Sequence, residues 1–175
     1  MKIVFIGLGN MARAVIGGML RKDIVKPEDI IGTAKTRETR EKTAAEFGIQ
    51  TMEKNADAAA RADVLVLAVK PQFLEEVIRE IKDVTKPDTL VISVAAGKSL
   101  AWLEEAFGRK MKLVRCMPNT PALVGAGCTG VCAGEAVSEE EKNYSLRLME
   151  SFGKADLMPE RLIDAAGAVS GSSPA

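Results

Sequence analysis

The residues best suited to chemistry stand near the start of the chain, where glycines follow a short apolar run. Gly7, Gly9 and Ala12 have the spacing G-x-G-x-x-A, which is typical of dinucleotide binding when a strand precedes it and a helix follows. The first glycine permits a tight turn, the second lets the backbone approach a pyrophosphate, and the alanine allows close packing of helix on strand. An ordinary glycine turn is the alternative. Cofactor binding is favoured because both flanking elements are predicted.

Those flanking elements belong to a longer alternation of strands and helices. The apolar run 3–6 predicts a buried strand, and the spacing of apolar residues from Asn10 to Met19 predicts a helix. Further strands are expected at 29–33, 64–69, 89–94 and 112–116, with edge strands at 123–134 and 155–158. Helices are expected at 38–47, 55–61 (with Asn55 as its N-cap), 71–81, 99–107 and 139–152. Repeated βα units predict an α/β fold of the Rossmann type, with a doubly wound, mostly parallel sheet.

Composition restricts the chemistry further. The chain has 175 residues, 47% of them hydrophobic, and a formal net charge of zero, so it has no electrostatic footprint for nucleic acid or a membrane surface. No apolar run reaches the length of a membrane span, and the first strand starts directly after Met1-Lys2, so a cytoplasmic protein is expected. The chain contains no histidine, and its three cysteines form no C-x-x-C pair. We expect the cysteines to be buried and no metal site to form.

Ligands of such sheets bind beyond the carboxyl ends of the strands, at the point where the strand order reverses. Four segments that follow predicted strands should converge there, and they supply most of the expected cofactor contacts. The full set is Ile6, Gly7, Leu8, Gly9, Asn10, Met11, Lys35, Thr36, Arg37, Asn55, Ala68, Val69, Lys70, Pro71, Ala95, Ala96 and Asn119.

The segment after the second strand indicates which cofactor is used. NAD-binding proteins usually place an acidic residue there to hold the ribose 2′-hydroxyl. This chain has Lys35, Thr36 and Arg37 instead, with no acid before Glu38. Cations and hydroxyls suit a 2′-phosphate, so NADP is predicted, with NAD as the alternative.

Later motifs give the chain a family resemblance. The stretches LAVKPQ (67–72), ISVAAG (92–97), RCMPNTPA (115–122) and SGSSPA (170–175) follow the glycine motif in order. Together they resemble pyrroline-5-carboxylate reductase, and the resemblance covers the whole chain. It implies an oxidoreductase that reduces the cyclic imine 1-pyrroline-5-carboxylate to L-proline with NADPH or NADH, the last step of proline biosynthesis.

The resemblance also implies where the substrate lies. Ser170, Gly171, Ser172 and Ser173 are expected to form a turn that opens a helix at Pro174, and helix N-termini bind anions such as the substrate carboxylate. Asn119 and Thr120 belong to a loop near the nicotinamide, where holding the loop is as good an explanation of their presence as contact with ligand.

Members of the family continue beyond this motif into an all-helical domain through which they form homo-oligomers. We therefore expect a cofactor-binding domain at 1–158, then a linker and the beginning of the helical domain at 159–175. The apolar face formed by Leu162, Ile163, Ala166 and Val169 should lack a partner. Catalytic residues are expected mainly beyond Ala175, so this chain alone should bind cofactor with negligible turnover.

Two other hypotheses stay open at this point. One is a non-catalytic dinucleotide-binding regulatory module that kept the fold and lost the chemistry. The other is a different imine or β-hydroxyacid dehydrogenase with the same kind of first domain.

Overall fold

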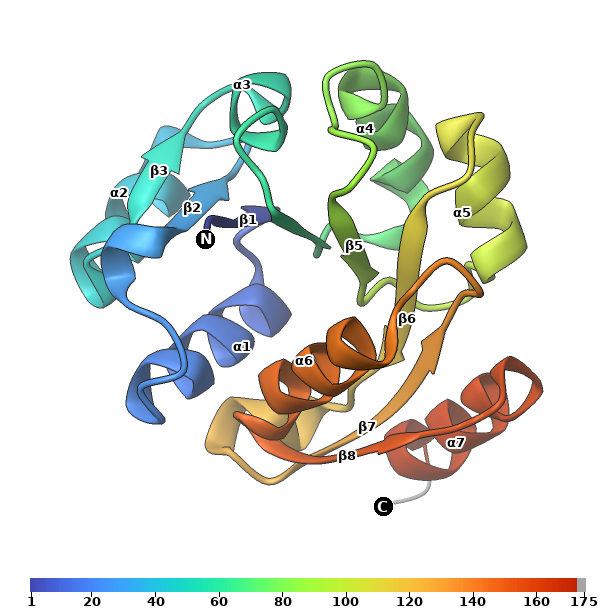
Figure 1. Cartoon of the computed structure of the whole chain (residues 1–175). Helices are drawn as coiled ribbons and strands as arrows, with labels where there is room; N and C mark the ends of the chain where they lie inside the picture. The colour runs from blue at the N-terminus through green and yellow to red at the C-terminus, as the bar shows by residue number, and fades with distance from the viewer. Residues whose placement is uncertain (173–175) are drawn as a thin grey trace.

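An eight-stranded sheet forms the centre of the protein (Figure 1). The structure is a computed structural model that describes the backbone of residues 1–172 and the side chains of residues 1–168. The strand order is β3-β2-β1-β4-β5-β6-β7-β8. The strands are β1 (Ile3–Ile6), β2 (Ile30–Thr33), β3 (Gln50–Met52), β4 (Val64–Leu67), β5 (Leu90–Ser93), β6 (Lys112–Met117), β7 (Gly127–Ala133) and β8 (Gly153–Leu157). Neighbouring strands are parallel except β6 and β7. The predicted Rossmann-type fold is confirmed.

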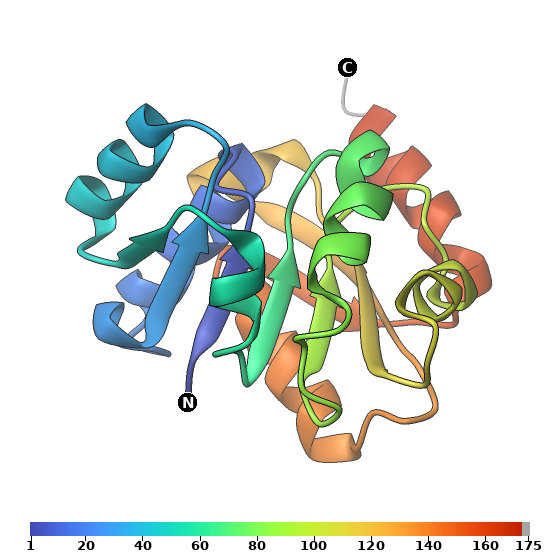
Figure 2. The ribbon, with the colours of Figure 1, turned by 90° about the horizontal axis from the view of Figure 1, so that it is seen from above.

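Helices cover both faces of this sheet (Figure 2). The α-helices are α1 (Asn10–Arg21), α2 (Arg37–Phe47), α3 (Asn55–Ala59), α4 (Leu74–Ile81), α5 (Leu100–Phe107), α6 (Glu139–Glu150) and α7 (Glu160–Ser172). Short 3-10 helices lie at η1 (Pro27–Asp29), η2 (Pro71–Phe73) and η3 (Thr120–Val124). One core cluster joins α1, α2 and α6 to the sheet, and a second joins α3, α4 and α5 to the opposite face. Alternate residues of each central strand enter the two clusters, which is why these strands are apolar throughout.

The structure differs from the sequence prediction at several elements. The helix predicted at 71–81 is divided into η2 and α4. Strand β3 was not expected, because its three residues are exposed or half-buried and form no apolar run. The stretch expected as an edge strand from residue 123 begins instead with η3, where Pro121 favours a helical turn. Its strand, β7, lies between β6 and β8, so the predicted edge position is wrong there. Asn55 is the first residue of α3 and not its N-cap; Lys54 holds that place without a side-chain cap.

Helix α7 packs on the sheet, so the expectation that its apolar face lacks a partner is wrong for the middle of the helix. Ile163 is fully buried, and Gly167 is buried as well. A Cβ on Gly167 would lie 2.7 Å from Cε of Met117, so the helix lies directly against the end of β6. Leu162 is 40% exposed. Within residues 1–172, no helix is long and apolar enough to cross a membrane.

Candidate cofactor-binding site

The carboxyl ends of the central strands are tied together by backbone hydrogen bonds. The N–H of Gly7 donates to the carbonyl of Thr33 at 3.0 Å, and the N–H of Ala68 donates to the carbonyl of Ile6 at 2.9 Å. The loops that follow β1, β2 and β4 therefore begin side by side at one edge of the sheet (Figure 2). The strand order reverses between β1 and β4. The predicted convergence of these segments is confirmed.

The glycine turn between β1 and α1 has two glycines with different surroundings. Gly7 has a φ of +96°, and a Cβ there would lie 2.8 Å from the carbonyl oxygen of Ala68. Gly9 is the N-cap of α1, with an ordinary φ of −74° and no side-chain cap. A Cβ at Gly9 would meet no protein atom within 4 Å. The protein itself thus requires a glycine at position 7, whereas the space beside Gly9 is open to a ligand.

The other residues of this turn divide into buried and accessible ones. Ile6 is fully buried, and Leu8 is only 2% exposed. The Leu8 side chain lies over Gly32, where a Cβ would come within 2.5 Å of it. Asn10 is exposed and Met11 half-buried at the start of α1. Any contact of Ile6 or Leu8 with a cofactor would therefore involve the backbone.

The segment after β2 presents its polar side chains to solvent. Lys35, Thr36 and Arg37 are all exposed, and the hydroxyl of Thr36 caps α2 by accepting from the N–H of Thr39. Arg37 forms an ion pair with Glu41 across one helical turn at 2.6 Å. Arg40, which was not predicted, donates to the carbonyl of Ala34 at 2.8 Å and so holds this segment to the first turn of α2. Its position one turn after Thr36 was the available signal.

Asn55 joins the end of β2 to α4. Its Oδ1 accepts from the hydroxyl of Thr33 at 2.7 Å, and its Nδ2 donates to Oε2 of Glu80 at 2.8 Å. Thr33 in turn accepts from Gly7 through its backbone. The amide of Asn55 is thereby held in one orientation, and two hydrogen bonds through Thr33 connect it to the glycine turn. These two bonds were not predicted, because Thr33 and Glu80 lie 22 and 25 residues from Asn55 in sequence.

The loops after β4 and β5 complete this edge of the sheet. Ala68 and Val69 are half-buried beside Gly7, and Lys70 is exposed as the N-cap of η2, whose first residue is Pro71. Ala95 is buried, whereas Ala96 is exposed. The structure places all of these residues at the carboxyl edge, and their contact with a cofactor stays a prediction.

Asn119 holds the loop between β6 and β7. Its Oδ1 accepts from the N–H of Cys128 at 2.8 Å, so the loop-holding explanation of this residue is confirmed. A role in cofactor binding stays a prediction.

The expected substrate turn differs from the structure. Ser170, Gly171 and Ser172 lie in the last turn of α7, so the predicted turn is wrong at these three positions. The sequence prediction failed because these small residues suit a turn, while the helix started at Glu160 continues through them. Ser173 lies outside the described residues, and the role of the set in substrate binding stays a prediction.

The cysteines have unlike surroundings. Cys116 and Cys132 are buried, as expected, but Cys128 is exposed, so the expectation of burial is wrong there. Burial raises the pKa of the Cys116 thiol, and the Cys132 thiol has a raised pKa chiefly for the same reason. In the part of the chain that the structure describes, no group of three His, Cys, Asp or Glu residues could hold a metal ion.

Thiol reactivity should follow this division. With iodoacetamide at neutral pH, we expect Cys128 of the folded protein to be alkylated before Cys116, because thiolate formation at Cys116 is opposed by burial. Peptide mass spectrometry at several times measures the order, and the same reaction in denaturant should modify all three cysteines. Equal rates for Cys116 and Cys128 in the folded protein would contradict the assignment.

The fold and the glycine turn define this chain as a dinucleotide-binding domain of the Rossmann type. Residues 2–97 match the family model described as "NADP oxidoreductase coenzyme F420-dependent". The match covers β1 to β5 and the glycine turn. The chain belongs to this family.

Comparison with curated proteins extends the similarity to the whole chain. Pyrroline-5-carboxylate reductase of Pseudomonas aeruginosa is 45% identical over 175 residues, which are 99% of this chain and 64% of that protein. Pyrroline-5-carboxylate reductase of Escherichia coli is 39% identical over 174 residues, 99% of this chain and 65% of that protein. The chain thus spans just under two thirds of the length of these relatives.

Solved structures show the same similarity as the curated proteins. A pyrroline-5-carboxylate reductase from Coxiella burnetii has a TM-score of 0.95 at 36% identity, over 99% of this chain and 64% of that one. Pyrroline carboxylate reductase from Plasmodium falciparum, solved with NADP bound, has a TM-score of 0.86 at 32% identity, over 99% of this chain and 63% of that one. The resemblance to pyrroline-5-carboxylate reductases that the sequence motifs indicated is confirmed.

Proposed function

We propose that the gene product carrying this chain reduces 1-pyrroline-5-carboxylate to L-proline with NADPH, as the last step of proline biosynthesis in the cytoplasm. The similarity of the whole chain to pyrroline-5-carboxylate reductases carries this proposal. Homo-oligomer formation, which the same resemblance implies, stays a prediction.

The residues at the carboxyl edge fit a dinucleotide phosphate. The open space beside Gly9 and the N-terminus of α1 can accept a pyrophosphate. The cations Lys35 and Arg37 lie exposed where an NAD-binding protein usually has a carboxylate. The relative from Plasmodium falciparum was solved with NADP bound, which supports NADP as the cofactor of this chain.

The chemistry requires placement more than acid–base side chains. When bound, NADPH supplies a hydride to the electrophilic carbon of a C=N bond. The chain's part is to hold the cofactor through the glycine turn and the loops after β2, β4 and β5, and to help exclude water from the reacting atoms. The chain has no histidine, which agrees with a reaction in which the cofactor supplies the hydride and the protein supplies the placement. We propose residues 1–158 as the cofactor-binding unit.

The test is pyrroline-5-carboxylate-dependent oxidation of NADPH by the full-length gene product, followed at 340 nm. Turnover that requires both compounds is the expected result. Tight binding of NADPH without turnover would instead support the non-catalytic module, and turnover only with a β-hydroxyacid and oxidised cofactor would support the other dehydrogenase.

Cofactor preference should depend on the segment after β2. Replacing Lys35 and Arg37 together with alanine should weaken NADPH binding by about 1–3 kcal/mol, because charge-assisted bonds to the 2′-phosphate are lost. NADH binding should change little, since NADH lacks that phosphate. Calorimetric titration of both cofactors measures the difference.

Lys42 and Lys82 provide the matched control, because they lie on α2 and directly after α4 and no cofactor contact is assigned to them. Their replacement by alanine removes the same net charge and should leave the NADPH preference unchanged. An equal loss of NADPH and NADH affinity in the Lys35/Arg37 variant would contradict the 2′-phosphate assignment. Lys35→Glu should move the preference further toward NADH by repelling the phosphate.

A further inference from the structure

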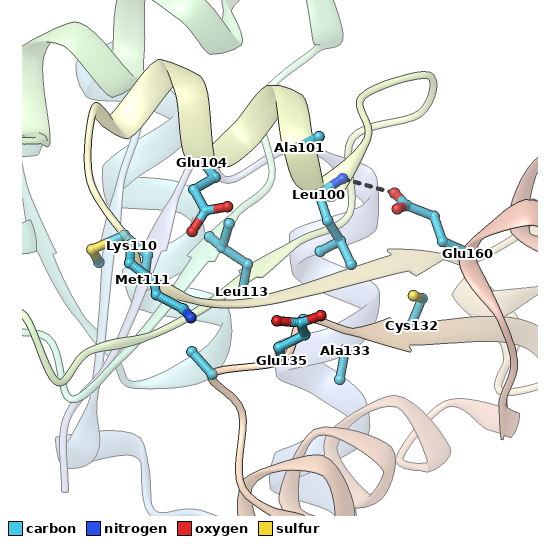
Figure 3. A pocket seen from close by; sticks show the side chains of 12 residues that line it. Leu100, Ala101, Glu104, Lys110, Met111, Leu113, Cys132, Ala133, Glu135 and Glu160 are labelled. Atoms are coloured by element: carbon cyan, nitrogen blue, oxygen red, sulfur yellow. Dashed lines mark hydrogen bonds between the residues drawn. The ribbon is translucent and has the colours of Figure 1, made fainter.

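Three segments near the expected reacting end of the site meet at one carboxylate, that of Glu160 in the first turn of α7. The first is the start of α5, which follows the loop 95–97 after β5. The second is β6, which carries Arg115 and leads to the loop of Asn119. The third is α7 itself, whose last turn contains residues 170–172. Figure 3 shows Glu160 beside the N-terminus of α5, at the rim of a groove of about 430 Å³.

The carboxylate of Glu160 is held by two donors from different elements. Its Oε1 accepts from the backbone N–H of Leu100 at 2.7 Å, drawn as the dashed line in Figure 3. The same oxygen accepts from Nη1 of Arg115 at 3.3 Å. Arg115 also donates through Nη2 to Asp164, one turn further along α7.

Burial distinguishes the two carboxylates. The Arg115 side chain is only 3% exposed, and the Glu160 side chain is 33% exposed. The Asp164 side chain is 72% exposed, and no hydrogen bond to α5 is found for it among the described residues. A buried guanidinium requires an anionic partner, and both carboxylates supply charge. Only Glu160 also reaches the backbone of α5.

The bond to Leu100 satisfies a group that a helix start leaves without a partner. The N–H groups of the first helical turn have no acceptor within the helix. In α5 the hydroxyl of Ser99 accepts from the N–H of Trp102, and Glu160 supplies the acceptor for Leu100 from 60 residues away. The start of α5 is therefore fixed by a side chain of α7.

We propose that Glu160 is a positioning residue that links α7 to the loop after β5, so that cofactor binding at that loop stabilises α7. Leu100 follows Gly97 by three residues, so a loop held by the cofactor also holds the N–H that donates to Glu160. The link is reciprocal, because two sites that share a coupling free energy stabilise one another equally. This inference rests on the proposed binding of NADPH at residues 95–97.

Amide hydrogen exchange of this chain with and without NADPH tests the link. In the wild-type chain, we expect saturating NADPH to slow exchange in residues 160–168 by about fivefold or more, the usual lower range of coupling between sites. In Glu160→Ala this NADPH-dependent slowing should disappear. A purely structural role would instead raise exchange in α7 equally with and without NADPH, and would leave the slowing factor intact.

Matched variants test the acceptor and the donor of the hydrogen bond between Glu160 and Leu100 separately. Asp164→Ala also removes a carboxylate from Arg115 but leaves the bond to Leu100, so it should retain the slowing. Leu100→Pro removes the donor itself; proline is tolerated at the first helical position, and Ser99 has the extended backbone that precedes proline. Leu100→Ala is its control, because it removes the same side chain and keeps the N–H.

The outcomes separate the inference from the proposed function. Loss of the slowing in Glu160→Ala and Leu100→Pro, with retention in their two controls, supports the link. Should Glu160→Ala fail to fold by circular dichroism, the Leu100 pair decides alone. Slowing that persists in Leu100→Pro, or that is absent from a wild-type chain which binds NADPH, overturns the link only. A wild-type chain that does not bind NADPH by calorimetry overturns the cofactor proposal and the link together.

Discussion

Gly9→Val should abolish nucleotide binding while leaving the fold intact. Position 9 has a φ of −74°, which any L-residue adopts, and a Cβ there meets no protein atom within 4 Å. The valine side chain would instead occupy the space that a pyrophosphate needs at the start of α1. We expect NADPH affinity to fall by at least about 100-fold, equivalent to about 3 kcal/mol. Calorimetric titration measures it.

Circular dichroism and urea unfolding provide the controls for this variant. The free energy of unfolding should fall by no more than about 1 kcal/mol, the usual range for a changed N-cap residue. Ala60→Val also introduces a valine, at an exposed residue after α3, and should leave binding unchanged. Retained NADPH binding in a folded Gly9→Val protein would show that this glycine is only a turn residue.

Gly7→Ala should damage the fold itself. The backbone at position 7 has a φ of +96°, and an added Cβ would lie 2.8 Å from the carbonyl oxygen of Ala68 and 3.0 Å from Cγ1 of Val69. The strained φ alone costs about 1–3 kcal/mol, and relief of the contact must also move the strand end that Ala68 follows. We expect the free energy of unfolding to fall by at least about 2 kcal/mol, measured by urea denaturation.

Gly108→Ala separates the two causes. Gly108 has a φ of +69°, and a Cβ there meets no atom within 4 Å, so this variant carries the backbone strain without the contact. Its destabilisation should be clearly smaller than that of Gly7→Ala. Equal losses would show that the contact with Ala68 relaxes without cost, and that steric exclusion of a Cβ is not what requires a glycine at position 7.

The sequence by itself determined the elements whose cause is local. The run 3–6, the two glycines and the helical spacing after them predicted β1, the turn and α1, because periodicity and turn chemistry act within a few residues. The fully apolar run of β4 likewise predicted a strand covered on both faces. From these strands the topology rules led to a doubly wound sheet, and hence to the edge at which the loops converge.

Only the tertiary structure decided the features that depend on partners far away in sequence. Asn55 resembles a helix cap locally, but its amide bonds to Thr33 and Glu80. The exposure of Cys128 likewise follows from its place in the folded chain. Its neighbours in sequence are small residues of little polarity, which predicted burial instead. Strand β3 is held mainly by pairing with β2, which supplies backbone partners to a sequence with no strand pattern.

The burial of Arg115 is the clearest example of a feature that depends on residues far away in sequence. In the sequence it is one charged residue at the start of a family motif, and nothing nearby says that its side chain is enclosed. In the structure, Glu160 and Asp164 arrive from α7, 45 and 49 residues later, and make that burial possible. A guanidinium can leave water only where anionic partners meet it, and which carboxylates those are is decided when α7 packs on β6 and β7.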